Sequence, residues 1–384
     1  MTREAARSGP TMGHVRPVVP DDIPRVAELY AKVFGPRGGG AMEGLREVLR
    51  DVFFRHPWLD DRLPSLVYQA REGRILGCLG VVPRPMSLKG RPIQAAISHT
   101  VMVDPDCRTT LAAVELIRAF LSGPQDVSIS QGTSLSRRIF EGVGGSTSLL
   151  HSFGWTRVLR PSRYVLAFLR RRGLSTGVSA ALTLLCRAAD ALAGRVHPFR
   201  FSSAGLTGEP LDPETLATCV SVFLRDRALQ PTYDAASLKW LLELLARENA
   251  DAPLRRVVVR DASGETVGGY LYYGHATGLG EVVQIVARPT SVEAVLDHLF
   301  NDAYRHGLVA VSGQLDPPFL NALAARHCLF NRGDGSWLLF HAKDHDITAA
   351  IHRGDALLTR LDAEWWIGFV LRCSLERSHL EVTP

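Results

Sequence analysis

The chain has few cysteines, and they are not arranged to bind a metal. Its six cysteines are spread over 384 residues with no CxxC pair and no regular spacing. This distribution argues against a disulfide framework and against a zinc site. Scattered thiols are typical of a reducing compartment, where cysteine behaves as a small apolar residue. We therefore expect a cytoplasmic protein without a metal cofactor.

Long apolar runs are also missing. Residues 1–13 are polar and lack the apolar core of a signal peptide. The most apolar window, residues 177–194, is interrupted by Arg187 and Asp190 and is short for a bilayer crossing. We interpret it as a buried helix. Three arginines at 170–172 precede it, so contact with a membrane surface is a less favoured alternative.

Neither sign of charge dominates. The 44 Lys and Arg residues exceed the 39 Asp and Glu residues only slightly, which gives a formal net charge of +5. No nucleic-acid recognition motif is present, so we expect no nucleic-acid partner. A mild positive field suits an anionic cofactor equally well.

Motifs of several enzyme classes are absent as well. The chain has no GxSxG elbow, no HExxH pair and no phosphate loop ending in GK followed by Ser or Thr. Residues 142–145 (GVGG) are too short for a dinucleotide fingerprint, and they follow a predicted helix where a strand is required. These absences argue against hydrolases of those types, metalloenzymes and dehydrogenases.

The order of predicted elements indicates an α+β fold with a mixed sheet. A length of 384 residues is too great for one ordinary core, so two domains are expected. The first half reads as the following elements: a strand (14–19), helices (23–34, 42–55), an antiparallel meander (65–71, 74–84, 91–103), a helix (107–121), a strand (126–131), a helix (135–143) and a last pair of strands within 153–168.

The second half repeats this order. Two helices at 213–226 and 235–249 precede a hairpin at 255–274, a strand at 280–287, a helix at 292–305 and a strand at 308–314. We therefore expect two tandem domains of one topology. Their predicted bounds are 14–169 for the N-terminal domain, 170–200 for a helical linker, 201–345 for the C-terminal domain and 346–384 for a helical extension.

The segment that carries most chemistry is Val101–Ala113, which leads from a strand into a helix through a turn that contains Pro105. The first amides of such a helix are unpaired, and with the helix dipole they form a site for an anion such as a pyrophosphate. Arg108 adds a cation, and Thr109 and Thr110 add hydroxyl donors. A turn that only caps a helix is the alternative.

This segment resembles the acyl-CoA motif of the GNAT superfamily of N-acyltransferases, in which a strand ending V-x-P is followed by x-x-R/Q-x-x-G-x-G/A. Val103, Pro105, Arg108 and Ala113 match it, whereas Leu111 stands where the family usually has glycine. The resemblance implies acetyl-CoA, or another acyl-CoA, as co-substrate. It implies that the cofactor contacts Val101, Met102, Val103, Arg108, Thr109, Thr110, Leu111, Ala112, Ala113, Ser134 and Arg138.

Residues 134–144 are similar to a later family segment, N-x-x-A-x-x-L-Y-E-K-x-G. Ser134 replaces the asparagine, and Phe140 replaces the tyrosine that protonates the departing thiolate in many members. The general acid therefore stays open. The resemblance also implies that the strand diverges from its neighbour near residues 101–103, which frees backbone amides for the thioester carbonyl.

His99 is the candidate general base. Even steps separate it from Val101 and Val103, so a regular strand would direct all three side chains to one side. An ordinary histidine pKa near 6.5 suits removal of a proton from an ammonium group. A histidine that only packs in the core is the alternative.

The corresponding turn of the second half, residues 286–294, contains a proline and an arginine but no glycine. Glu293 would repel a pyrophosphate there. We interpret this copy as degenerate, with a role in structure or in the substrate surface.

Near the end of the chain, Asp362 and Glu364 precede Trp365 and Trp366. The favoured interpretation is a helix start with acidic residues in its first turn. The sharper hypothesis is that Asp362 or Glu364 reaches the cleft between the two halves and binds an amine substrate.

Together these features predict an acyltransferase that moves an acetyl or other acyl group from acyl-CoA directly to a primary amine in a ternary complex. The acceptor would be a small molecule or a peptide. The alternative is a catalytically silent binding or scaffold protein of the same fold, which Leu111 and Phe140 favour.

Overall fold

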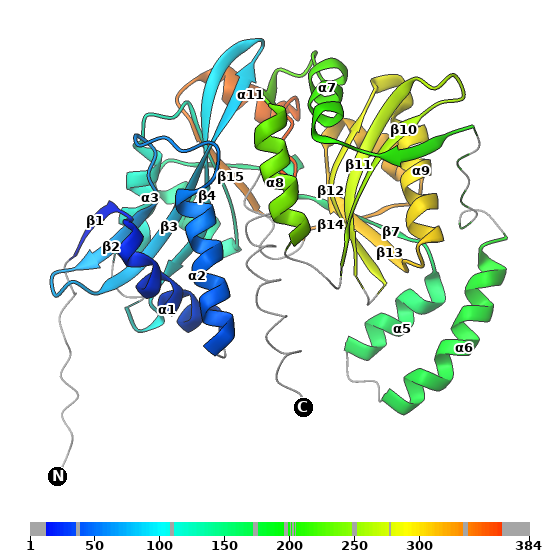
Figure 1. Ribbon diagram of the computed structural model, residues 1–384, viewed down its shortest axis with the longest axis horizontal. Coiled ribbons are helices and arrows are strands. Elements are labelled where there is room, and N and C mark those ends of the chain that lie inside the picture. The colour runs from blue at the N-terminus through cyan, green and yellow to red at the C-terminus, as the bar shows by residue number, and fades with distance from the viewer. Residues whose placement is uncertain are drawn as a thin grey trace.

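The computed structural model describes residues 13–35, 39–107, 111–171, 176–195, 199, 201, 203, 205–247, 252–275, 278–332 and 337–362. Their strands form two mixed sheets, with helices between the sheets and on their outer faces (Figure 1). This arrangement confirms the predicted mixed α and β architecture.

The first sheet has the order β1-β2-β3-β4-β5-β15-β6, and β9 pairs with β3. All of these neighbours are antiparallel except β4 and β5, which are parallel. The strands are β1 (Gly13–Pro17), β2 (Leu66–Ala70), β3 (Ile75–Leu88), β4 (Arg91–Val103), β5 (Val127–Gly132), β6 (Ser146–Ser148), β9 (Leu229–Pro231) and β15 (Trp337–Ala342).

The second sheet has the order β14-β7-β13-β12-β11-β10-β8, and its parallel pair is β12 and β13. Each sheet thus contains an antiparallel meander that ends in a strand with a parallel neighbour. The strands are β7 (Gly154–Val158), β8 (Thr207–Pro210), β10 (Leu254–Arg260), β11 (Thr266–Gly274), β12 (Leu279–Ala287), β13 (Ala310–Gln314) and β14 (Leu329–Asn331).

Helices fill the space between the sheets and cover both outer faces. Both faces of a sheet such as the second one are apolar and need a cover, because successive side chains of a strand point to opposite faces. On β10, Val258 packs in the central core, whereas Val257 and Val259 pack in the core under α9. The central helices are α1 (Ile23–Phe34), α2 (Gly39–Phe54), α7 (Pro213–Phe223) and α8 (Ala235–Arg247). The outer helices are α3 (Ala112–Leu121) and α4 (Ser134–Gly142) on the first sheet, and α9 (Val292–Arg305) and α10 (Leu320–Ala325) on the second. Helix α11 (His345–Arg353) packs beside β15 and β9.

The two halves exchange a strand. β7 follows the first half in sequence but pairs with β13 and β14, whereas β15 comes from the second half and pairs with β5 and β6. The predicted domain bounds, 14–169 and 201–345, therefore do not separate the two sheets. Apolar alternation indicates that a strand is buried, but it does not identify the neighbour against which it pairs.

Two local predictions were wrong. The second of the strands predicted within 153–168 is helix α5 (Pro161–Arg171), which begins at a proline, as helices often do. The apolar window at 177–194 is a helix as predicted, α6 (Thr176–Ala193), but it is not buried, because Leu184, Leu185 and Leu192 are exposed. Helices α5 and α6 pair as a hairpin beside the second sheet (Figure 1).

Within the described part of the chain, no helix combines the length and the apolar content needed to cross a bilayer.

Candidate functional site

A bulge in β4 shapes the candidate site. Met102 lies opposite Cys78 on β3 and His99 lies opposite Gly80, so β4 contains one residue more than β3 over this stretch. Thr100 has a positive φ of 51°, a conformation that a β-branched residue rarely adopts. The extra residue reverses the direction of the side chains that follow it.

Strands β4 and β5 diverge directly before this bulge. Their parallel ladder joins residues 95–97 to residues 127–129 and ends there, although both strands continue. The opening between them is a cavity of about 140 Å³ that helices α3 and α4 close from the outer face. Its described lining residues are Leu79, Ser98, Val101, Met102, Val103, Ala113, Ile117, Phe120, Ser130, Gln131, Leu135, Ser136, Ile139, Phe140 and Leu339.

The lining is apolar with a few uncharged polar groups. Beyond residue 97 the ladder between β4 and β5 is not continued, so amides of β4 can turn towards the cavity. In an apolar cavity, such amides can hold a carbonyl oxygen on which charge develops. No described lining residue has a titratable side chain, and the hydroxyl of Ser98 is buried without a hydrogen-bond partner.

The structure brings part of the predicted cofactor set to this cavity. Val101, Met102, Val103 and Ala113 line it, and Ala112 is buried beside them at the start of α3. Leu111 is 64% exposed, so its side chain does not fill the turn. Arg108, Thr109 and Thr110 lie outside the described residues.

An ion pair that the sequence analysis missed holds the turn before α3. Lys32 of α1 places Nζ 2.5 Å from Oδ1 of Asp104 and 2.7 Å from Oδ2 of Asp106. Hydrogen bonds to these two carboxylates raise the pKa of Lys32. Burial acts to raise the pKa of Asp104, but hydrogen bonds from Lys32 and from the Asp106 amide bring it below its ordinary value. Lys32 thus offsets two negative charges next to the expected anion site.

The structure places His99 away from the cavity, and the even-step argument was wrong. Because the bulge intervenes, His99 points to the opposite side of the sheet from Val101 and Val103 and contacts Phe53 of α2 at a ring distance of 5.2 Å. Nδ1 lies 2.8 Å from the Thr100 hydroxyl, and Nε2 is buried without a hydrogen-bond partner. Burial lowers the pKa of His99 to about 3, with a smaller effect from His56.

Ser134 and Arg138 lie on α4 outside the cavity lining. Ser134 accepts a hydrogen bond of 3.2 Å from Nε1 of Trp337, and Arg138 is exposed. The guanidinium groups of Arg137 and Arg332 both lie 4.1 Å from the Trp337 ring. Trp337 belongs to the exchanged strand β15, so the sequence of the first half contains no signal for this cluster.

Phe140 occupies the cavity wall where the resemblance places a tyrosine. Its ring is buried and lines the cavity, so this position provides no hydroxyl. The described hydroxyls along the wall belong to Ser98, Ser130 and Ser136.

The second sheet has an equivalent divergence that is almost closed. The parallel ladder of β12 and β13 covers residues 279–281 of β12 and then ends. Beyond it the free space is only about 20 Å³, bordered by Trp155 and Phe319. Arg360 donates to the Val282 carbonyl there at 3.2 Å.

The turn of the second half also differs from its counterpart. Glu293 lies in the first turn of α9 and forms an ion pair with Arg326 at 3.4 Å. Arg288 pairs with Glu265 at 2.6 Å. The charged side chains of this turn are thus engaged within the protein.

Asp362 is held by side chains within the protein. It is buried, and Arg84 donates to Oδ1 at 2.9 Å, while the Tyr233 hydroxyl lies 2.7 and 2.8 Å from its two oxygens. Thr359 donates a further hydrogen bond at 2.9 Å. Partners inside the protein therefore satisfy this carboxylate. Glu364 lies outside the described residues.

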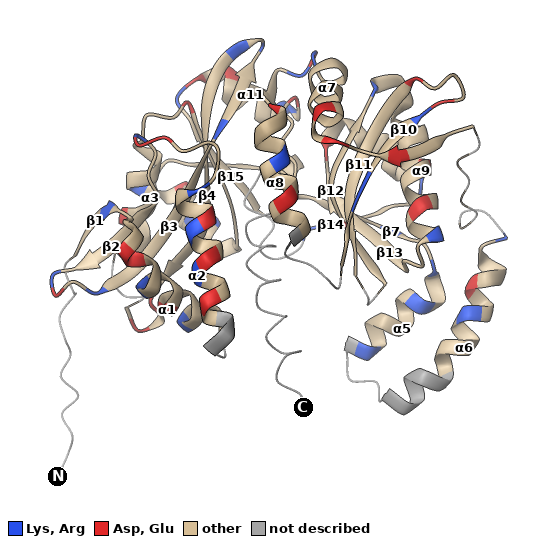
Figure 2. Ribbon diagram, in the orientation of Figure 1, with Lys and Arg blue, Asp and Glu red and all other residues tan. Residues whose placement is uncertain are grey.

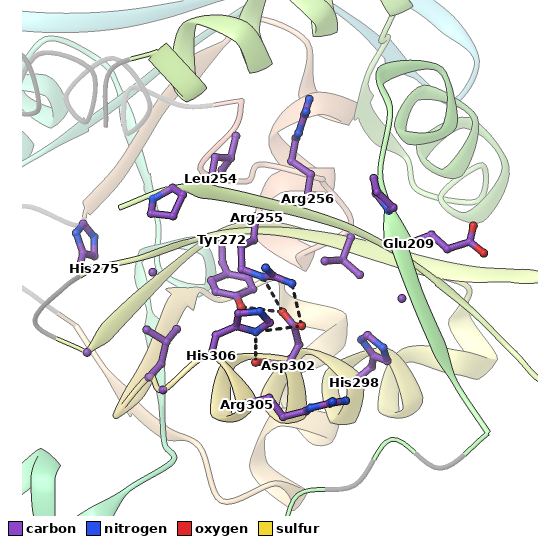
Figure 3. A pocket seen from close by; sticks show the side chains of 18 residues that line it. Glu209, Leu254, Arg255, Arg256, Tyr272, His275, His298, Asp302, Arg305 and His306 are labelled. Carbon is purple, nitrogen blue, oxygen red and sulfur yellow. Dashed lines mark hydrogen bonds and ion pairs between the residues drawn. The ribbon is translucent and has the colours of Figure 1, made fainter. Parts of the chain in front are cut away.

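A larger open pocket of about 830 Å³ borders β10, β8 and the end of α9 (Figure 3). At its centre Asp302 accepts hydrogen bonds from Arg255 and Tyr272 and lies 3.4 Å from Nδ1 of His306. These groups satisfy one another. The pocket also lies away from both strand divergences, so we do not place the candidate site there.

Comparison with solved structures identifies proteins with a similar fold. The chain is similar to a conserved protein of unknown function from Enterococcus faecalis V583, described as a probable N-acyltransferase, at 11% identity and a TM-score of 0.57 over 86% of this chain and 73% of the other. It is similar to GCN5-related N-acetyltransferases from Kribbella flavida (12%, 0.54, covering 86% and 72%) and Anabaena variabilis ATCC 29413 (13%, 0.56, covering 85% and 72%).

The chain has the GCN5-related N-acetyltransferase fold. At these identities the similarity establishes the architecture, and the chemistry of this GNAT-fold chain must be argued from its own residues. No protein-family model matches the chain, and no curated protein matches it.

Proposed function

We propose that this chain transfers an acyl group from acyl-CoA to a primary amine at the β4–β5 cavity. The observation that carries the proposal is the divergence of β4 and β5 at a bulge, with an unfilled apolar cavity behind it. Where paired strands diverge, backbone amides can turn towards the space between them. A thioester carbonyl bound between β4 and β5 would accept hydrogen bonds from such amides.

The turn before α3 would receive the charged end of the cofactor. Leu111, the residue before α3, makes no side-chain cap hydrogen bond and is exposed. Lys32 holds the carboxylates of Asp104 and Asp106, which would otherwise repel a pyrophosphate. Arg108, Thr109 and Thr110 remain proposed ligands on the strength of their position in the sequence.

The residues of the cavity would orient and shield the reaction. When bound, the cofactor would supply an activated acyl group whose thiolate is a good leaving group. The amine nitrogen would form the new C–N bond as the C–S bond breaks, and the β4 amides would stabilise the carbonyl oxygen. Because no described lining residue titrates, the amine would have to arrive uncharged, and the proton that it loses on forming the amide would pass to water or to the departing thiolate.

The same geometry supports direct transfer. The described lining contains no cysteine or other strong nucleophile that would carry the acyl group as a covalent intermediate. The acceptor would therefore meet the thioester in a ternary complex, entering from the side that faces the second half. Asp362 would stabilise the joint between the halves through Arg84 and Tyr233, and it would not bind the amine.

Calorimetry with CoA and acetyl-CoA, followed by release of free thiol in the presence of a panel of primary amines, tests the proposal. We expect one CoA site per chain with a dissociation constant in the micromolar range, and release of free thiol that depends on the amine. Absence of CoA binding at millimolar concentration would contradict the proposal.

A silent acyl-CoA binder is the second candidate, and a specific observation favours it. The described cavity wall has no titratable group, and Phe140 provides no hydroxyl. Tight CoA binding with no thiol release across the amine panel would select this candidate.

A further inference from the structure

The α5–α6 hairpin, residues 161–195, exposes apolar side chains that a soluble helix pair normally buries. Leu184, Leu185 and Leu192 of α6 are 70%, 68% and 62% exposed. With Ala188 they follow the spacing i, i+1, i+4, i+8, which places them on one face of the helix. Val165 and Leu169 of α5 are also exposed, at the spacing i, i+4.

The polar side of α6 faces inward instead. Asp190 is buried against α5, where it accepts from the Ser162 amide at 2.8 Å and from Nε of Arg163 at 3.0 Å. The hairpin thus uses its only carboxylate to join its two helices. Among the described residues, the hairpin leaves mainly apolar side chains and arginines on the outside.

The charge of the molecule is concentrated in the same segment. Residues 161–195 contain six arginines, one aspartate and no lysine or glutamate, and their net charge of +5 equals that of the whole chain. The remainder of the protein is therefore neutral in sum. Among the described residues, the exposed Arg187 and Arg195 form no ion pair, and Figure 2 shows basic positions on both helices with a single acidic band on α6.

The base of the hairpin is fixed to the body. Arg160, directly before α5, donates to the Tyr304 carbonyl at 2.7 Å, and its guanidinium lies 4.0 Å from the Tyr304 ring at the end of α9. Beyond this anchor the two helices extend beside the second sheet (Figure 1). An outward apolar face on such an arm can reach a flat surface without unfolding the domain.

We propose that the α5–α6 hairpin docks on the surface of an anionic lipid bilayer, with the leucine face in the headgroup region and the arginines on lipid phosphates. Exposed leucines alone would suit many partners, but the excess of arginine over carboxylate in this segment selects a surface that is both apolar and anionic. The helices lie in the interface, since no described helix can cross it. This inference does not depend on the acyltransferase proposal.

Sedimentation of the full chain with vesicles tests this proposal. We expect binding to vesicles of phosphatidylcholine with an equal share of phosphatidylglycerol, weak binding to phosphatidylcholine alone, and loss of binding in high salt. The double variant Leu185→Gln with Leu192→Gln should weaken binding by about tenfold or more. Arg187→Gln and Arg195→Gln should each weaken it by about fivefold at low salt.

Leu329→Gln is the matched control, because Leu329 is a similarly exposed leucine on β14. It should bind vesicles like the parent, and thermal melting should show that all variants remain folded. Should a variant fail to fold, hydrogen exchange of the parent replaces it: amides of residues 184–192 should slow only with anionic vesicles. Equal binding to both vesicle types, or equal binding by the leucine variant and the control, would overturn the proposal. The proposal would also be overturned if the parent protein were a dimer and the leucine variant a monomer. The apolar face would then bind a second copy of the chain.

Discussion

The two strand divergences of this molecule share a geometry and differ in what fills them. Behind β4 and β5 lies a cavity of about 140 Å³, whereas behind β12 and β13 only about 20 Å³ remains free. Two large rings, Trp155 from the exchanged strand β7 and Phe319, border the second opening. A fold that leaves an opening can thus use it for a ligand in one copy and for its own core in the other.

The largest effect should follow from emptying the second divergence. Trp155 is 1% exposed, and Nε1 donates to the Gln314 carbonyl at 3.1 Å. We expect Trp155→Ala to lower the free energy of unfolding by about 3–5 kcal/mol, because a large buried ring is replaced by a cavity. Denaturant unfolding measures this change.

The control lies on the neighbouring strand. Leu329 is directly opposite Thr156 and is exposed, so Leu329→Ala should change the stability by no more than about 0.5 kcal/mol. CoA binding should be unaffected by Trp155→Ala at a temperature where the variant is folded. If Trp155→Ala stays folded but loses CoA binding, the ligand binds at the second divergence and not at the first.

The converse experiment fills the first divergence. Ala113 lines the cavity from the start of α3, so Ala113→Trp should place an indole where the thioester would lie. We expect CoA affinity, measured by calorimetry, to fall by about 100-fold or more, equivalent to about 3 kcal/mol.

Ala294→Trp, in the first turn of α9, is the matched control in the second half. It should leave CoA affinity close to that of the parent. If Ala113→Trp binds CoA as well as Ala294→Trp does, the cavity between β4 and β5 is not the cofactor site.

A smaller effect is expected from adding a hydroxyl group to the wall of the first cavity. Phe140→Tyr introduces a hydroxyl into the cavity wall at the position where the resemblance to the GNAT superfamily implies a tyrosine. We expect kcat to rise by about tenfold at most, since a thiolate leaves readily without much protonation. Phe120→Tyr adds a hydroxyl from α3 to the same cavity and should not raise kcat. Equal rates for both variants would indicate that water or one of the serines already supplies the proton.

The sequence was sufficient for local features of the site. The strand-to-turn-to-helix path through Val101, Pro105 and Ala113 could be predicted, because spacing and proline position act locally. Three features could not. Thr100 adopts a positive φ that its residue type disfavours, Lys32 meets Asp104 across 72 positions of sequence, and β15 enters the first sheet from the far half.

The missed features have one physical origin. Each depends on tertiary contacts that override a local preference, so no window of neighbouring residues contains them. The consequence was greatest for His99, whose predicted orientation assumed a regular β4. A single extra residue moved it from the cavity side to the α2 side of the sheet.

The smallest effect on turnover should come from His99→Gln. His99 lies across the sheet from the cavity, so we expect kcat to remain largely unchanged. A loss of about 100-fold with stability intact would restore its role as general base.

The pH dependence of stability should respond to the same substitution. The pKa of His99 is about 3 in the folded state and near 6.5 when unfolded, so protons bind preferentially to the unfolded chain between these values. The stability associated with neutral His99 is therefore fully present above about pH 6.5 and is lost as the pH falls towards 3. His56 and His151, whose pKa values are about 4 because of burial, act in the same direction. Denaturant unfolding between pH 7 and pH 4 should show a shallower decline for His99→Gln than for the parent, because glutamine does not titrate. An identical decline in both proteins would mean that His99 binds a proton as readily in the folded state as in the unfolded chain.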